Sequence, residues 1–410
     1  MRNDVITVLD IGSSKVAAAA IRVLDDGALE VAAAASTDSK GIRRGVVIDV
    51  AAASDAVDVA LKRVHQSAGI DIQGVIIGIG GPHVHGVNSQ GYLPLFPRGR
   101  TITREDVLQV INHSRQVGAP AASEQVQAFP REFIIDGRGG VSAPIGMTGG
   151  RLEVLTHIVS AESVYLQNLD RAVGKAGKRV SQMVLRSLAS GLAVLSPDEM
   201  DKGVAVVDIG GGTSEVAIFV EGSVVFSGSV PVGGQLVTSD VSKLLKTSPD
   251  EAERLKLHHG AALADLTLDE EAVDVLQLGQ THARPMQRRV LCEIVEARMR
   301  ELALMVRQVL GKSALFGKLP GGLVLTGGAS KLTGTAALFE EVMPEHKVRF
   351  GEPRVSGPKA ELVNIPSMAA VVGLALYVAR SDDDELSPAS GPGDWKDRIS
   401  TFWSLVSGRA

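Results

Sequence analysis

A strand, a turn of small residues and a second strand occur twice in this 410-residue chain, roughly 200 residues apart. The first copy covers residues 5–23 with its turn at 12–14, and the second covers residues 203–220 with its turn at 210–213. A pattern that recurs over such a distance predicts a tandem duplication. Because strands and helical patterns alternate around both copies, we expect an α/β fold of two related halves that face each other.

Changes in local composition and pattern along the sequence predict further domain boundaries. Between about residues 83 and 160, short strands surround one helical pattern, which favours a small inserted α+β domain. The stretch after residue 380 is acidic and then rich in Ser, Pro and Gly, a composition that cannot bury apolar surface. The expected units are a first core at 1–82 and 161–200, an inserted domain at 83–160, a second core at 201–232 and 311–380, an outer subdomain at 233–310, a flexible linker at 381–393 and a terminal helix at 394–410.

Both recurrent turns have the composition of a phosphate-binding loop. Where Gly and Ser replace bulkier residues, backbone N–H groups can converge on phosphate oxygens. The candidates are Gly12, Ser13 and Ser14 in the first turn, and Gly210, Gly211, Gly212 and Thr213 in the second. A third glycine-rich segment, LTGGASKLTG, follows an apolar strand at 322–326 and has the position of a base- or ribose-facing loop.

An aspartate precedes each recurrent turn, Asp10 in the first copy and Asp208 in the second. A carboxylate beside a phosphate is repelled unless a cation lies between them. The two aspartates therefore predict Mg²⁺, held through water.

These motifs resemble those of the actin-like ATPases, which include heat-shock chaperone ATPases, sugar kinases and the filament protein MreB. The resemblance implies that residues 12–15, including Lys15, and residues 210–213 clamp the β- and γ-phosphates of ATP. It also implies that Gly327, Gly328 and Ala329 contact the adenosine. The segment EAERLK resembles the helix that holds ribose and adenine, which nominates Glu253 and Lys256, although that pair also fits an ordinary surface salt bridge.

Within this superfamily, three segments resemble the FtsA family of bacterial cell-division proteins. They are PVGGQLVTSDV, which contains the further candidates Gly233 and Gly234, PIGMTGGRLEV in the inserted region, and the C-terminal tail. The resemblance implies an ATP-binding, self-associating adaptor. It would tether filaments of the tubulin-like FtsZ, through the FtsZ C-terminal peptide, to the cytoplasmic face of the bacterial inner membrane at the division site, and help to recruit later division proteins.

The resemblance also predicts slow or negligible ATP hydrolysis. MreB-like filament ATPases carry a Glu about 22 residues before the second phosphate-loop aspartate, where it orients the attacking water. The corresponding position here is Arg186, and a cation cannot act as a general base.

The last segment predicts an amphipathic helix at a membrane surface. Its apolar stripe consists of Trp395, Ile399, Phe402, Trp403 and Val406. The same stripe could instead pack on the protein's own body or on a partner. The opening residues lack a secretory signal pattern and no run is long enough to span a bilayer, so we expect a peripheral protein of the cytosolic side.

Composition limits the classes of binding partner that we expect. The net charge of −5 argues against a nucleic-acid partner. The arginines between 288 and 307 could meet the acidic FtsZ peptide or form a solvated helix face. The lone Cys292 predicts a small buried thiol, and the nine histidines are expected at the surface or at helix ends.

Two alternatives share the fold. A sugar-kinase-like phosphotransferase would need a carboxylate base in the cleft and has no use for the tail. A PilM-like platform protein for pilus assembly has a similar inserted domain, and again the tail argues against it.

Overall fold

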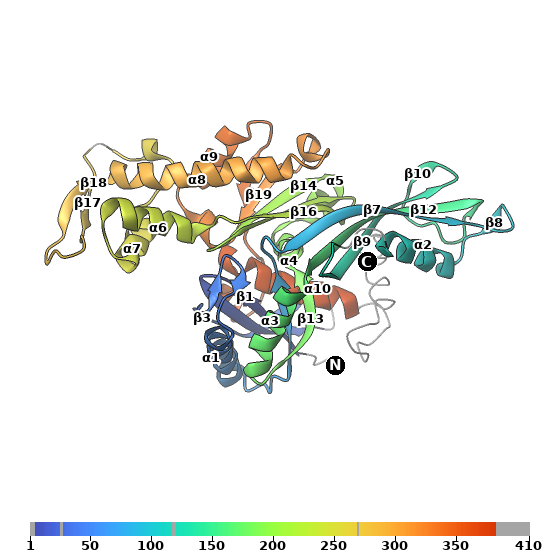
Figure 1. The fold of residues 1–410 in the computed structure, drawn as a ribbon, viewed down its shortest axis with the longest axis horizontal. Helices are drawn as coiled ribbons and strands as arrows, with labels where there is room; N and C mark the ends of the chain where they lie inside the picture. Colours follow the sequence, from blue (N-terminus) through green and yellow to red (C-terminus); the bar gives the residue numbers. More distant parts are fainter. Residues whose placement is uncertain (1–4, 25–27, 117–119, 269, 383–410) are drawn as a thin grey trace.

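The computed structural model describes residues 5–24, 28–116, 120–268 and 270–382 of the chain (Figure 1). Two five-stranded sheets dominate it. The first contains, in spatial order, β13 (Arg179–Leu185), β6 (Gly74–Ile79), β1 (Val5–Ile11), β2 (Lys15–Val23) and β3 (Leu29–Asp38). The second contains β20 (Val348–Phe350), β19 (Leu323–Thr326), β14 (Val204–Ile209), β15 (Ser214–Val220) and β16 (Ser223–Val230).

The two sheets have the same topology. In each, three consecutive strands form an antiparallel meander, and two later strands add in parallel beside the first. The strand β1 therefore corresponds to β14, β2 to β15 and β3 to β16. This correspondence confirms the predicted duplicated α/β fold.

Two helices join the halves. The helix α4 (Arg186–Val194) follows β13, and α10 (Ala369–Asp382) packs directly against it. One hydrophobic core contains α4, α10, the first sheet and one face of the second sheet, including Val206 and Phe219. The opposite face of the second sheet forms a separate core with α8 (Arg288–Leu310) and α9 (Thr335–Val342). Because period-2 alternation sends neighbouring side chains to opposite faces, Val206 and Val207 belong to different cores.

The remaining helices cover the outer faces. The helix α1 (Val50–Ala68) begins where the Asp49 carboxylate accepts the Ala51 and Ala52 N–H groups, and it lies over the first sheet with α3 (Ser163–Lys175). The helix α5 (Pro197–Lys202) has a capping box between Ser196 and Glu199. A short hairpin of β4 (Ile42–Arg43) and β5 (Val46–Val47) precedes α1.

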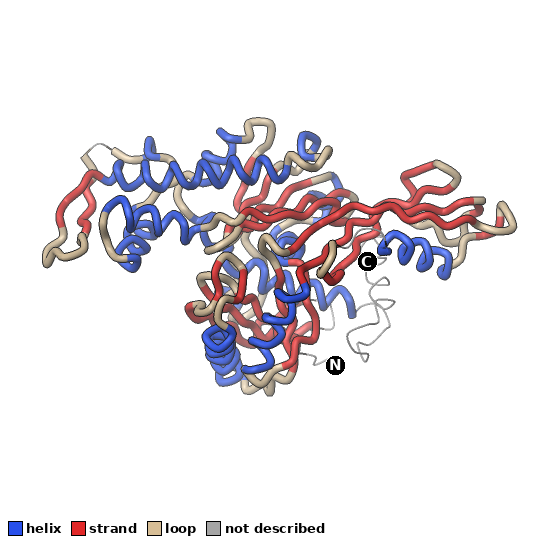
Figure 2. The backbone as a smooth tube through the Cα atoms, viewed as in Figure 1, coloured by secondary structure: helices blue, strands red, loops and turns tan. Residues whose placement is uncertain are grey.

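The segment after β6 forms a separate four-stranded sheet that extends far from the cores (Figure 2). Its strands, in spatial order, are β10 (Arg138–Val141), β9 (Ser123–Ile135), β12 (Arg151–Glu162) and β7 (Val84–Pro94). The helix α2 (Arg104–Gln116) covers this sheet and shares a small core with it. Near its tip, β8 (Arg100–Thr101) pairs with β11 (Thr148–Gly149).

The opposite end of the molecule consists mainly of helices. The helices α6 (Gly234–Leu245) and α7 (Pro249–His259) pack together beside α8, and β17 (Ala272–Val275) and β18 (Arg284–Gln287) form a projecting ribbon. The helix α8 begins only at Arg288, because Met286 pairs with Val273 in the ribbon.

Glycine at position 373 allows α10 to cross α4 closely. A Cβ at Gly373 would overlap the backbone of Ala189. We expect Gly373→Ala to lower the free energy of unfolding by roughly 1–3 kcal/mol through overpacking. The matched control is Gly174→Ala in α3, an exposed helix position with open space around it, which should instead raise stability by up to about 1 kcal/mol. Thermal and denaturant unfolding of both variants would measure the difference. Equal effects would contradict the close crossing.

Candidate functional site

A cavity of about 330 Å³ lies between the two halves. The three glycine-rich segments line it, although they are far apart in the sequence. Of the predicted site residues, those lining the cavity are Asp10, Gly12, Ser13, Ser14, Lys15, Asp208, Gly210, Gly211, Gly212, Thr213, Gly234, Glu253, Lys256, Gly327, Gly328 and Ala329. Gly233 is outside this lining and packs against the backbone of Gly210 and Gly211.

The two recurrent turns have the same hydrogen bond and meet face to face. Gly12 N–H donates to Lys15 O at 3.0 Å, and Gly210 N–H donates to Thr213 O at 3.0 Å. A Cβ at Gly211 would overlap the Ser14 hydroxyl, so only glycine permits this approach.

Further hydrogen bonds support the contact between the turns. Gln235 Nε2 donates to Ser13 O at 3.0 Å, which connects the start of α6 to the first turn. Ser13 Oγ in turn accepts the Gly45 N–H at 2.9 Å. The first turn is thus held from both halves.

Glu253 and Lys256 lie at one side of the cavity, on α7. Lys256 is buried, and its ammonium donates to Gly234 O at 3.2 Å, to Thr238 Oγ1 at 2.9 Å and to Glu253 Oε2 at 2.7 Å. The i,i+3 salt bridge that the sequence left open is therefore present, with the Glu253 side chain 42% exposed and the Lys256 side chain buried. The ammonium also fixes α7 to the beginning of α6, where Gly234 lines the cavity.

Four charged side chains gather at the floor of the cavity. Arg186, the first residue of α4, has its Nε 2.8 Å from Asp10 Oδ1 and donates a second bond to Ile11 O at 3.3 Å. Asp208 Oδ2 accepts the Ser190 hydroxyl at 2.5 Å. Glu215, on β15 opposite Asp208, is also buried. The guanidinium of Arg186 is therefore the counter-charge for three carboxylates, those of Asp10, Asp208 and Glu215.

Burial perturbs this cluster strongly. Desolvation raises the pKa of the Asp208 carboxyl, and it also raises the pKa of Glu215, although Arg186 opposes both shifts. Burial disfavours the charged form of Arg186, but Asp10 and Glu215 outweigh it and raise the pKa of the guanidinium. Arg186 is consequently a permanent cation within the cavity.

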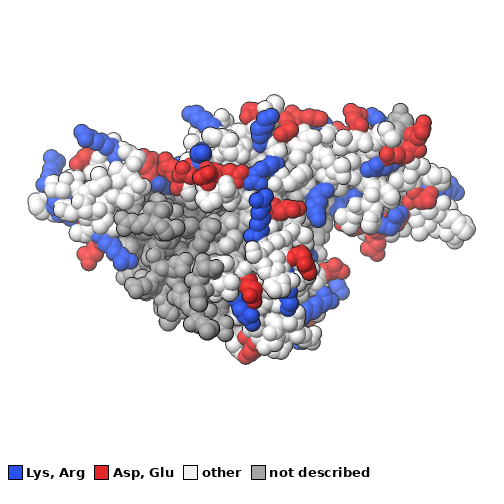
Figure 3. All heavy atoms as spheres, turned by 180° about the vertical axis from the view of Figure 1, so that it is seen from behind, with Lys and Arg blue, Asp and Glu red and all other residues white. Residues whose placement is uncertain are grey.

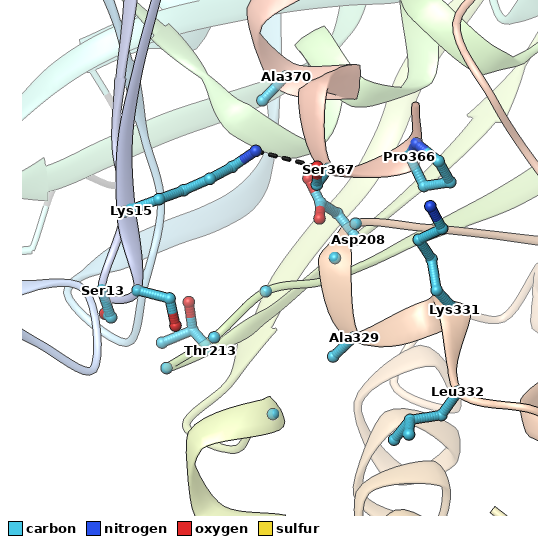
Figure 4. A pocket seen from close by; sticks show the side chains of 18 of the residues that line it. Ser13, Lys15, Asp208, Thr213, Ala329, Lys331, Leu332, Pro366, Ser367 and Ala370 are labelled. Atoms are coloured by element: carbon cyan, nitrogen blue, oxygen red, sulfur yellow. Dashed lines mark hydrogen bonds between the residues drawn. The ribbon is translucent and has the colours of Figure 1, made fainter. Parts of the chain in front are cut away.

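Lysines from both halves add positive charge (Figure 4). Lys15 reaches across from β2, and its Nζ donates to Ser367 Oγ at 2.9 Å. Burial lowers the pKa of the Lys15 ammonium. Lys331, from the segment after β19, approaches from the second half. Backbone N–H groups of two glycine turns together with these cations fit a polyanionic ligand.

The carboxylates also fit a divalent cation that is held mainly by a ligand. Asp10 and Asp208 both face the cavity, as Mg²⁺ coordination through water requires. In the part of the chain that the structure describes, no group of three or more His, Cys, Asp or Glu residues could hold a metal ion alone. A cation here would need phosphate oxygens and water to complete its shell.

Sequence reasoning missed Glu215, Lys331 and Ser367 as lining residues and treated Arg186 only as a missing acid. Glu215 could have been found from the sequence. Residues two apart on a strand share a face, and Thr213, two residues earlier, was already predicted to line the site. Ser367 carries no local signal, because it reaches the site only through the packing of α10 on α4.

Comparison with known proteins places this sequence in a family. The sequence model described as "Cell division protein FtsA" matches residues 205–373, and the model described as "SHS2 domain inserted in FTSA" matches residues 81–160. The FtsA of Pseudomonas aeruginosa is 35% identical, over 92% of this chain and 90% of its own length. The chain belongs to the FtsA family. The FtsA proteins of Escherichia coli K12 and Bacillus subtilis 168 are 30% and 31% identical, over 96% and 92% of this chain and 96% and 84% of their own lengths.

Solved structures confirm the actin-like fold. The structure titled "PilM-PilN type IV pilus biogenesis complex" aligns with a TM-score of 0.65 at 16% identity, covering 91% of this chain and 98% of that one. MreB5 of Spiroplasma citri bound to ADP aligns with a TM-score of 0.57 at 12% identity, covering 94% and 100%. The same MreB5 has also been solved with AMPPNP. At these identities the likeness concerns the fold alone.

Several other sequence predictions have clear outcomes. Cys292 is buried, as predicted. The placement of all histidines at the surface or at helix ends is wrong, because His83, His157 and His346 are buried. Burial lowers the pKa of both His83 and His157 to about 4.

The tail lies outside the described residues, as do the five predicted membrane-binding side chains. Within the described residues, every helix is too short or too polar to cross a membrane.

The charge cluster predicts that replacing Arg186 lowers the free energy of unfolding by an amount that depends on pH. Because the folded-state pKa values of Asp208 and Glu215 lie above their ordinary values, each lowers stability as the pH rises through its folded-state pKa. Arg186→Met removes the compensating cation and should cost roughly 3–5 kcal/mol of unfolding free energy at pH 8. The loss should be smaller at pH 5, where these carboxyls are more protonated.

The control is Arg22→Met, which removes an exposed ion pair with Glu30 and should cost less than about 1 kcal/mol at either pH. Denaturant unfolding at both pH values measures the comparison. A pH-independent loss in Arg186→Met would contradict the proposed compensation.

Proposed function

We propose that this chain is an ATP- and Mg²⁺-binding adaptor that self-associates and tethers FtsZ filaments to the cytoplasmic face of the bacterial inner membrane at the division site. It would also help to recruit later division proteins. Membership of the FtsA family supports the cell-division role. The observation that carries the nucleotide part is the meeting of two glycine turns with the same hydrogen bond, one from each half, at a cavity lined by four cationic side chains and four carboxylates.

The site residues take separate roles in this proposal. Residues 12–15 and 210–213 would hold the phosphates, because their backbone N–H groups and Lys15 line the cavity. Gly327, Gly328 and Ala329, with Glu253 and Lys256, would hold the nucleoside at the side formed by α7. Asp10 and Asp208 would hold Mg²⁺ through water.

ATP would serve mainly as a structural ligand in this adaptor. Candidate nucleotide-binding residues from both halves line one cavity. Bound ATP would therefore favour the closed arrangement of the two halves by mass action. Arg186 occupies the position where an acid is expected in active filament ATPases, and its guanidinium is engaged by Asp10. We therefore infer a turnover below about 1 per second, the low end of typical enzymes.

Exposed apolar side chains at opposite ends of the long axis support head-to-tail self-association. Leu276 and Leu278 lie beside the ribbon of β17 and β18, while Phe96, Ile145 and Met147 lie near the tip of the inserted sheet. Two unlike patches at opposite ends make a heterologous contact, and such contacts generate open filaments when the rotation does not close a ring.

Charge on the described surface favours protein partners over a nucleic acid. Figure 3 shows Lys and Arg side chains interspersed with Asp and Glu side chains over one face. On α8, Arg288 pairs with Glu271, and Arg298 pairs with Asp240. An acidic FtsZ peptide that docks on this helix would have to exchange these partners, so the proposal leaves its contact residues unassigned.

Membrane attachment is proposed to involve the tail. Its stripe of Trp395, Ile399, Phe402, Trp403 and Val406 suits the headgroup boundary. Each buried apolar side chain contributes about 1.5–3 kcal/mol before ordering costs. Single tails should bind weakly, and several tails on one polymer would bind stably.

The nucleotide part of the proposal predicts that Gly211→Ala weakens ATP binding at least about tenfold, since the added methyl group separates the two turns. Isothermal titration calorimetry with Mg²⁺ and a non-hydrolysable ATP analogue measures the effect. Gly174→Ala, far from the cavity, is the matched control and should bind as the wild type does. The absence of binding by the folded wild-type protein would contradict the nucleotide assignment.

The tether predicts that Trp403→Glu abolishes recruitment of FtsZ to vesicles. A charge in the apolar stripe opposes burial, whereas Ser400→Glu adds the same charge on the polar face and should retain recruitment. Co-sedimentation with vesicles of anionic bacterial lipids, with and without FtsZ, separates the steps. If Trp403→Glu pellets FtsZ as well as the wild type does, the tail is not the anchor.

A further inference from the structure

Glu215 is the one pocket-lining carboxylate that the proposed function leaves without a role. It is buried at the floor of the cavity, on β15, two residues after Thr213 of the second turn. The Gly81 backbone and the Thr213 side chain lie close enough to its carboxylate to oppose the rise in the pKa of Glu215 that burial causes. Its Oε1 atom, however, is buried without a hydrogen-bond partner among the described residues.

Close packing holds this carboxylate in place. A Cβ at Gly80 would lie 2.9 Å from Glu215 Cδ and 3.1 Å from its Oε1, so only glycine leaves room for the group there. Arg186 supplies a neighbouring positive charge, which opposes the rise in the pKa of Glu215 that burial causes. Glu215 thus presents a fixed acceptor from the wall of the cavity that also carries the second glycine turn.

A buried acceptor without a donor is costly, so a ligand or water molecule should supply the missing hydrogen. A phosphate cannot, because its oxygens are acceptors and its charge repels a carboxylate. A water molecule between Glu215 and the terminal phosphate satisfies both groups. Such a water would be oriented by the same contact toward the phosphorus atom.

We propose that Glu215 is the general base for slow hydrolysis of ATP in this cavity, an inference that rests on the proposed nucleotide function. The water oxygen forms a bond to the γ-phosphorus while Glu215 Oε1 accepts a proton from that water. The bond from the γ-phosphorus to the β–γ bridging oxygen breaks, and its electron pair leaves with ADP. The proton on Glu215 then passes to the released phosphate.

In this proposal Glu215 takes the role of the acid that is absent at position 186. The carboxylate comes from β15 instead of α4, and Arg186 from α4 lies beside it. Because Arg186 is charged and bound to Asp10, it attracts the nearby Glu215 carboxylate and opposes the rise in its pKa that burial causes.

The test uses single-turnover release of phosphate from γ-labelled ATP with the full-length protein in excess. Glu215→Gln keeps the shape of the side chain but removes the base, so release should slow by about 100-fold or more. Calorimetry on the same sample should show analogue affinity within about threefold of the wild type. Glu153→Gln, which alters a buried carboxylate in the inserted sheet, should hydrolyse ATP at the wild-type rate.

A second variant separates a chemical role from a structural one. Glu215→Ala leaves space for a small carboxylate, so added formate should restore phosphate release in this variant and leave Glu215→Gln unchanged. Wild-type hydrolysis in Glu215→Gln, no formate rescue of a Glu215→Ala protein that still binds the analogue, or no measurable release by the wild type would each overturn the assignment. Failure of the wild type to bind the analogue would instead overturn the nucleotide function itself.

Discussion

The contact between the two glycine turns is the constraint on which the rest of the molecule depends. Gly211 lies against Ser14, and no side chain fits between them. The turns can meet because each half has the same meander of strands, and the same hydrogen-bonded turn joins the first two strands of each. A cavity bounded by both halves is the direct result.

The charge cluster beneath these turns places one cation among three carboxylates. Duplication brings Asp10 and Asp208 to equivalent positions, and β15 adds Glu215. Arg186 begins the helix that joins the two cores, so the compensating cation is placed by the same element that connects the halves. The site and the fold therefore share one element, α4.

Much of this architecture could be predicted from the sequence, since the signals are local. Apolar strands around Gly-rich turns predicted both hairpins, and the spacing between copies predicted the duplication. Glu253 and Lys256 could be nominated only through resemblance, because an i,i+3 pair is common on helix surfaces. Burial of Lys256 against Gly234 comes from the packing of α6 on α7, which the sequence does not encode locally.

The errors have a similar cause. Ser367 reaches the cavity through long-range packing, whereas Lys331 lies only two residues after the predicted Ala329 in the third glycine-rich segment. His157 was predicted at the surface, yet it is buried where its Nε2 lies 2.9 Å from Ser227 Oγ of the second half, a contact made across 70 residues.

A structure of the protein with Mg²⁺ and a non-hydrolysable ATP analogue tests the central claim most directly. We predict one triphosphate held between residues 12–15 and 210–213, with the nucleoside against Glu253, Lys256 and the turn that begins at Gly327. An analogue bound elsewhere, or bound to one turn while the other faces solvent, would contradict it.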